Sequence, residues 1–147
     1  MALPDLPPEA IALKIAVDDW RGAVRAAGGV LTASGFASPE YSDEMIRMIE
    51  EHGPYVVIAP GLALAHARPG PAVLRDGIAV VTLSRPVDFG HPYNDPVTVI
   101  VALAVVSAEA QIALVAELAN VFNDSSAISD LAAATSVDDV KRILGGS

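Results

Sequence analysis

Three short apolar runs, each bounded by turn residues, constrain the fold of this chain more than any other feature. They span residues 55–59, 78–83 and 97–103. Each run is too short for an ordinary helix and is apolar on both faces of an extended chain, so it predicts a strand covered by helices on one or both sides. Residues 11–17 partly alternate and are rich in branched side chains, which is typical of an edge strand.

Helical patterns separate and follow these runs. A first helix is expected to begin after Asp19 and to end at the Gly28-Gly29 pair, because glycine is a weak helix former. Ser38 and Pro39 are the residue types preferred at an N-cap and at a first helical position, so they predict the start of a second helix. Three further helices are predicted over residues 108–122, over residues 126–133 and from Ser136 onward.

Together these elements predict one α/β (α+β) domain with helices packed around a small sheet. The chain has 147 residues, which is typical of a single domain, and it contains no linker long enough to divide it. We therefore expect a single compact domain over residues 1–147. Residues 1–9 are rich in proline and are expected to form a loosely ordered N-terminal arm.

Composition and charge exclude several classes of protein. Apolar residues make up 52% of the chain, which excludes intrinsic disorder. The 9 Lys and Arg residues face 18 Asp and Glu residues, and a formal net charge of −9 argues against a broad nucleic-acid interface. Cysteine is absent, so the chain has no disulfide, no thiolate nucleophile and no Cys-ligated zinc. Any site for phosphate must therefore be local.

The sequence predicts neither a signal peptide nor a membrane-spanning helix. Residues 1–9 lack the basic region and the apolar stretch of a signal peptide. The longest uncharged apolar segment, residues 96–108, is shorter than the ~20 residues that a membrane-spanning helix needs. We expect a cytoplasmic protein with no direct membrane insertion.

Histidines are the main candidates for chemistry in a chain with few reactive side chains. His66 lies among small and apolar residues, and Arg68 follows two positions later. On an extended chain these side chains point to the same face and can meet one anion. A neutral imidazole is nucleophilic and a guanidinium matches phosphate oxygens, which suits a phosphorylated histidine. The alternative is that His66 is a partly buried structural side chain and Arg68 a solvated charge.

The other two histidines give weaker signals. His91 lies in a turn-rich loop, where it is either a second ligand for an anion or a metal, or simply solvated. His52 ends a predicted helix, where capping or packing is the favoured role. The sequence lacks the nucleophile elbow of hydrolases, the dinucleotide fingerprint, the Walker phosphate loop and the zinc-protease pair of histidines.

Several blocks of sequence together resemble a known family. They are Trp20, Tyr41 with Met45, GPYVVIAPGLALAHARP at 53–69, PVDFGH at 86–91 and NDPV at 94–97. Over residues 11–144 the chain resembles the enzyme IIA (EIIA) domains of the bacterial phosphoenolpyruvate-dependent sugar phosphotransferase system (PTS). Within the fructose/mannitol superfamily (type 2), it is most similar to the ascorbate-type branch. The resemblance implies a mixed β-sheet flanked by helices.

The resemblance also implies a phosphotransferase activity in which the chain is a phosphoryl carrier. The histidine that matches His66 accepts a phosphoryl group from the phosphohistidine of the small carrier protein HPr and passes it to a cysteine of the cognate enzyme IIB (EIIB). This transfer serves the uptake of a sugar or a sugar acid such as ascorbate. Candidates for holding the phosphoryl oxygens are Arg68, His91 and the N–H groups of a helix N-terminus. No metal, nucleotide or other cofactor is required.

The sequence departs from the family pattern at two positions. Ala65 stands where members usually have a proline before the active histidine. Gln111 stands where a second histidine normally opens the helix after the last strand, and its amide can donate a hydrogen bond but cannot carry charge. Three alternatives follow: His91 supplies the charge, transfer is slower, or the chain is a regulatory EIIA-like module that senses phosphorylation state without feeding a transporter. The oligomeric state stays open, with a homodimer as one alternative.

Overall fold

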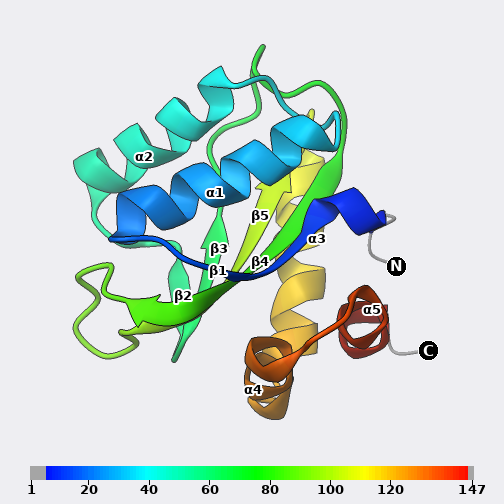
Figure 1. Cartoon of the computed structure of the whole chain (residues 1–147). Coiled ribbons are helices and arrows are strands. Elements are labelled where there is room, and N and C mark those ends of the chain that lie inside the picture. The colour runs from blue at the N-terminus through cyan, green and yellow to red at the C-terminus, as the bar shows by residue number, and fades with distance from the viewer. Residues whose placement is uncertain (1–5, 146–147) are drawn as a thin grey trace.

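A five-stranded mixed sheet separates two helical layers in the computed structural model, which describes residues 6–145 (Figure 1). The strands, in spatial order, are β1 (Ile11–Ile15), β4 (Gly77–Val87), β5 (Val97–Ala104), β3 (Leu62–Ala65) and β2 (Val57–Ala59). Strand β5 is parallel to β3 and antiparallel to β4. Seven of its eight residues are buried, as expected of a strand covered on both faces.

The helices lie on opposite faces of this sheet. Helices α1 (Trp20–Ala33) and α2 (Glu40–His52) cover one face, and α3 (Ala108–Phe122), α4 (Ser126–Ala133) and α5 (Val137–Gly145) cover the other (Figure 1). Each face has its own cluster of buried side chains, and the alternation along β5 divides its residues between the two clusters: Ile100 contributes to the first, Val101 to the second. The predicted fold class, a small mixed sheet flanked by helices, is confirmed.

The helix starts agree closely with the sequence. The Asp19 carboxylate accepts the N–H of Gly22 at the start of α1, and the Ser136 hydroxyl accepts the N–H of Asp139 at the start of α5. Helix α2 begins at Glu40 with Pro39 as its N-cap, so the predicted cap at Ser38 is one position too early.

The predicted end of the first helix is wrong, because α1 continues through the glycine pair to Ala33. The reason is the packing of α1 on α2. A Cβ atom built on Gly28 would lie 1.8 Å from Oγ of Ser42, which is far inside van der Waals contact. Gly28 therefore allows the close approach of two helices and does not end one.

Two details of the predicted strands also change. The run predicted at residues 55–59 is a strand only over Val57–Ala59, and Tyr55 lies in the turn before it. The block after it forms a separate strand, β3, which pairs with β5. Of the predicted N-terminal arm, residues 1–5 lie outside the described part of the chain; Leu6 packs against both buried clusters and Pro8–Ala10 forms a short 3-10 helix.

The sheet topology determines which loops can meet. Because β3 and β5 are parallel, with Ala65 opposite Ala102, their carboxyl ends lie at the same edge of the sheet. We call this the carboxyl edge; it carries residues 66–76 after β3 and residues 105–107 before α3. The loop of residues 88–96 joins β4 to β5 at the opposite edge, and Figure 1 shows it at the left, away from the chain that leaves β3 at the top. No helix within residues 6–145 is long and apolar enough to cross a membrane.

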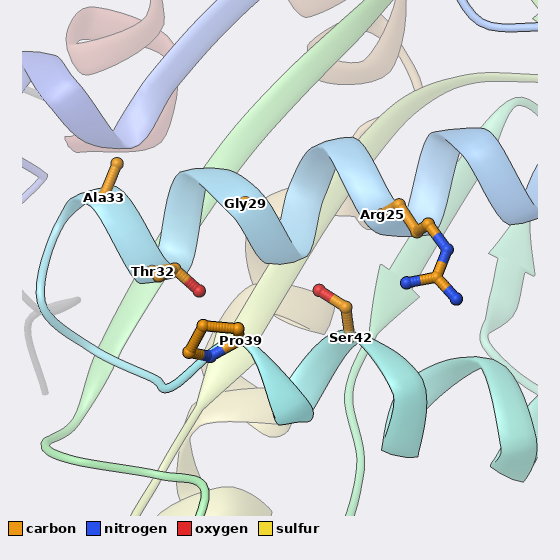
Figure 2. Close-up of a pocket in the computed structure, with 6 residues that line it drawn as sticks. All are labelled: Arg25, Gly29, Thr32, Ala33, Pro39 and Ser42. Atoms are coloured by element: carbon orange, nitrogen blue, oxygen red, sulfur yellow. The ribbon is translucent and has the colours of Figure 1, made fainter.

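A groove of ≈ 460 Å³ lies between α1 and α2, on the side of the molecule that α3 does not cover (Figure 2). In the close-up, the hydroxyl of Ser42 and the guanidinium of Arg25 extend between the two helices. No residue of the carboxyl edge lines this groove, whose wall comes from Arg25, Gly29, Thr32, Ala33, Pro39 and Ser42.

Candidate functional site

His66 is the first residue after β3 and lies at the carboxyl edge with its side chain partly buried. Its Nδ1 atom is 2.7 Å from the carbonyl oxygen of Leu64. A carbonyl oxygen only accepts hydrogen bonds, so Nδ1 carries the proton and the neutral ring has its free lone pair at Nε2. Nε2 is therefore the nucleophilic nitrogen of this imidazole.

The environment of His66 favours the neutral ring. Burial lowers the pKa of the imidazole below its ordinary value, and the hydrogen bond to the Leu64 carbonyl opposes this with a smaller rise. Desolvation disfavours the charged form of a histidine, which explains the direction of the pKa shift. The lone pair of Nε2 is thus available at neutral pH.

Two tyrosine hydroxyls bind the peptide group that joins His66 to Ala67. The hydroxyl of Tyr55 donates to the His66 carbonyl oxygen at 3.0 Å, and the N–H of Ala67 donates to the Tyr41 hydroxyl at 3.0 Å. Tyr41 in turn donates to the Leu103 carbonyl oxygen at 2.7 Å, which ties this segment to the end of β5. Burial raises the pKa of Tyr41 to about 12, so its hydroxyl is a neutral donor.

The ring of Tyr55 forms one wall of the site. It meets the imidazole of His66 edge-on, with ring centroids 5.5 Å apart and an interplanar angle of 88°. Partial burial raises the pKa of Tyr55, and the positive charge of Arg68 lowers it in part. The charge of Arg68 therefore acts on the same surface that His66 occupies. The Arg68 side chain is exposed and forms no ion pair with any residue between 6 and 145.

Gln111 lies in the first turn of α3, so it stands at the helix end that faces the carboxyl edge. Its side-chain Oε1 is buried and has no hydrogen-bond partner within the described chain. A buried acceptor without a partner costs about 1–3 kcal/mol. The other end of the carboxamide is an NH2 group, which can donate hydrogen bonds to an anion. The amide is thus free of internal bonds that it would have to break to bind an anion.

His91 is held by its own loop at the opposite edge. The carboxylate of Asp95 accepts hydrogen bonds from the backbone N–H groups of residues 89–91. Nδ1 of His91 accepts those of Tyr93 and Asn94, at 3.1 and 3.0 Å. The imidazole therefore orders the loop.

The structure does not bring His91 to His66. The Asn94 carbonyl oxygen accepts the N–H of Gly61 at 3.1 Å, which places the His91 loop beside the start of β3. His66 follows the end of that strand, so the full length of β3 separates the two side chains. We therefore correct the expectation that His91 supports a phosphoryl group on His66.

His52 is the last residue of α2 and is exposed. Within residues 6–145, no three histidine or acidic side chains are grouped as a metal site would require.

Comparison with known proteins assigns this fold and site to one class. Residues 6–146 match the family described as "Phosphoenolpyruvate-dependent sugar phosphotransferase system, EIIA 2". The chain therefore belongs to the type 2 EIIA family of that system, whose members are phosphoryl carriers. The predicted family resemblance is confirmed.

Individual relatives refine this placement. The "Ascorbate-specific PTS system EIIA component" of Shigella boydii serotype 4 is 35% identical over 133 residues, which are 90% of this chain and 86% of the relative. The crystal structure of IIA mannitol from Escherichia coli superposes with a TM-score of 0.85 at 28% identity, covering 96% of this chain and 99% of that one. The same enzyme in a complex with phosphorylated enzyme IIB gives a TM-score of 0.86 at 28% identity, covering 97% and 99%.

Sequence reasoning missed Tyr41 and Tyr55 as members of the site. It named Tyr41 as part of the family resemblance and placed Tyr55 in a predicted strand. A buried tyrosine needs a hydrogen-bond partner for its hydroxyl, and that requirement is the signal that marks Tyr41 in an otherwise apolar stripe. Tyr55 carries no comparable signal, because its partner is a backbone carbonyl 11 positions away.

Proposed function

We propose that this chain carries a phosphoryl group on Nε2 of His66, accepting it from phospho-HPr and passing it to a cysteine of a cognate EIIB. The observation that carries the proposal is the hydrogen bond from Nδ1 to the Leu64 carbonyl, which leaves Nε2 free. Support for the acceptor comes from the complex of E. coli IIA mannitol with phosphorylated IIB. We also propose a cytoplasmic location, as expected from the lack of signal-peptide features in residues 1–9.

The chemistry requires only two in-line transfers of the phosphoryl group, first from nitrogen to nitrogen and then from nitrogen to sulfur. The lone pair of Nε2 attacks phosphorus as the P–N bond of the donor breaks, and the electron pair of that bond returns to the donor imidazole. In the second step the EIIB thiolate attacks, and the pair of the new P–N bond returns to Nε2. Such transfers depend mainly on positioning and on stabilising charge at the equatorial oxygens. The proton stays on Nδ1 throughout and is donated to the Leu64 carbonyl oxygen, which stabilises the phosphorylated, positively charged ring.

Three groups at the carboxyl edge are suited to the equatorial oxygens. Arg68 offers a permanent charge with no competing ion pair among the described residues. The first backbone N–H groups of α3 lie at a positive helix end. Gln111 offers an amide donor in that turn. His91 has no part in this arrangement.

For the transported compound, we propose a sugar acid of the ascorbate type. The support is the 35% identity to an ascorbate-specific EIIA component over 90% of this chain. Growth or uptake assays on ascorbate, with and without the gene for this chain, test this assignment independently of His66.

The central test is phosphorylation in a reconstituted relay. The protein is incubated with phosphoenolpyruvate, enzyme I and HPr, and intact mass is measured for a single acid-labile phosphoryl group. His66→Ala should abolish the adduct and His52→Ala should retain it. An absent adduct on the unaltered protein contradicts the proposal, and an adduct on His66→Ala contradicts the assignment of the residue. An adduct that no EIIB accepts would instead favour the regulatory alternative.

A further inference from the structure

The peptide group after His66 is restrained more tightly than its position in a loop requires. Its carbonyl oxygen and its N–H belong to one planar unit and point to opposite sides. Tyr55 binds the carbonyl side and Tyr41 binds the N–H side, each at 3.0 Å. Rotation of this unit would break both hydrogen bonds together, so the backbone that carries the imidazole is held in one orientation.

The imidazole itself is restrained at two further points. Nδ1 is bound to the Leu64 carbonyl, and the imidazole packs against the ring of Tyr55 in a T-shaped arrangement. Turning the ring over would break the bond at Nδ1 and move each nitrogen to a position now held by a ring carbon. Within residues 6–145, these contacts leave Nε2 as the ring nitrogen without a hydrogen bond.

We propose that Tyr55 is a positioning residue for phosphoryl transfer, in which its hydroxyl holds the His66 carbonyl and its ring packs against the imidazole, so that Nε2 faces the incoming phosphorus. This inference rests on the proposed function of His66. It adds a residue that touches neither the phosphoryl group nor the reacting nitrogen.

Tyr55 is separable from the fold, whereas Tyr41 is not. Tyr41 is 1% exposed and binds β5 as well as the site, so its loss affects folding. Tyr55 is 39% exposed, and its hydroxyl is bonded to the His66 carbonyl. A change at Tyr55 therefore alters the orientation of His66 while the two buried clusters stay intact.

The expected magnitude follows from the sensitivity of transfer to alignment. A displacement of about 1 Å can cost on the order of 100-fold in rate. Tyr55→Phe keeps the ring and removes one hydrogen bond, so we expect phosphoryl uptake to slow about fivefold, which corresponds to about 1 kcal/mol at 1.36 kcal/mol per factor of ten. Tyr55→Leu removes the ring edge as well and should slow uptake by roughly tenfold or more.

The experiment compares Tyr55→Phe with Tyr93→Phe in the full-length chain. Tyr93 is 87% exposed in the loop at the opposite edge, so it is a matched control for the loss of a tyrosine hydroxyl. Single-turnover uptake from phospho-HPr gives the rate, and nitrogen NMR of the His66 ring gives the fraction protonated at Nδ1. Tyr55→Phe should lower both the rate and that fraction, and Tyr93→Phe should change neither.

The outcomes separate this inference from the proposed function. If Tyr55→Phe leaves the rate within about twofold of the unaltered protein and the ring nitrogen shifts unchanged, the positioning role is overturned. A lower thermal midpoint with unchanged nitrogen shifts would show a purely structural role and would also overturn it. If the unaltered protein takes up no phosphoryl group, the proposed function fails, while the NMR comparison still shows whether Tyr55 orients His66.

Discussion

The two edges of the sheet each carry a histidine in a loop, and their hydrogen bonds run in opposite directions. At the carboxyl edge, Nδ1 of His66 donates to a carbonyl oxygen and leaves the lone pair of Nε2 free. In the loop of residues 88–96, Nδ1 of His91 accepts two backbone N–H groups, so its lone pair is already used to order the loop. The hydrogen bond at one ring nitrogen therefore decides what the other nitrogen can do.

The two regions also differ in how they are held. The Asp95 carboxylate binds backbone N–H groups no more than six positions away, so the His91 loop is ordered by its own residues. The segment at His66 depends on distant ones: Tyr41 binds Ala67 across 26 positions and Leu103 across 62. A self-contained loop suits a structural role, whereas the site at His66 forms only when the sheet and α2 are assembled.

The largest effect that we expect is the loss of phosphoryl uptake on replacing the carboxyl-edge histidine. His66→Gln keeps a polar side chain and removes the nucleophile, so uptake from phospho-HPr should fall to background. His91→Gln is the matched variant, and its uptake rate should stay within about twofold of the unaltered protein. A time course of intact mass measures both. An equal loss of uptake rate in the two variants would contradict the functional difference between His66 and His91.

A second effect concerns the stability of the carboxyl edge. Tyr41→Phe leaves the Ala67 N–H and the Leu103 carbonyl without their shared partner, and an unsatisfied buried group costs about 1–3 kcal/mol. We expect the free energy of unfolding in urea to fall by about 2–4 kcal/mol. Tyr93→Phe should change it by less than about 0.5 kcal/mol, because that side chain is exposed. Similar values for the two variants would argue against the Tyr41 link.

The smallest effect is the pH dependence of stability that His66 contributes. Because burial lowers the pKa of His66 below 6.5 in the folded chain, the unfolded chain binds more protons as the pH falls through that value. This contribution to stability is therefore complete above pH 6.5 and declines below it. His66→Gln should lose less stability than the unaltered protein between neutral and mildly acidic pH, as measured by urea unfolding at each pH. If the two proteins lose the same free energy of unfolding as the pH falls, a lowered pKa for His66 is contradicted.

Sequence analysis succeeded where the evidence is local. The apolar runs predicted β4 and β5, and Ser136 marks a helix start that the structure retains. His66 was singled out by its apolar surroundings and by its spacing from Arg68. The glycine pair in α1 misled the prediction, because the weak helix propensity of Gly28 is outweighed by the space that it leaves for Ser42.

The site could be predicted only in part, since its geometry depends on strand order. The prediction that His91 supports His66 assumed that two loops meet, and the parallel pairing of β3 with β5 places them at opposite edges. Tyr55 and Tyr41 were not predicted as site residues, because each acts through a hydrogen bond to the peptide group between His66 and Ala67. The type of a residue does not identify such a backbone partner.

The sequence by itself determined the class of fold, the family and the identity of the candidate nucleophile, because periodicity, turn residues and side-chain chemistry are properties of short segments. Only the tertiary structure decided that His91 lies at the opposite edge from His66, which nitrogen of His66 is free, and which tyrosines hold it. Those properties follow from contacts between residues far apart in the chain, such as Tyr41 and Leu103, which exist only once β3, β5 and α2 are packed together.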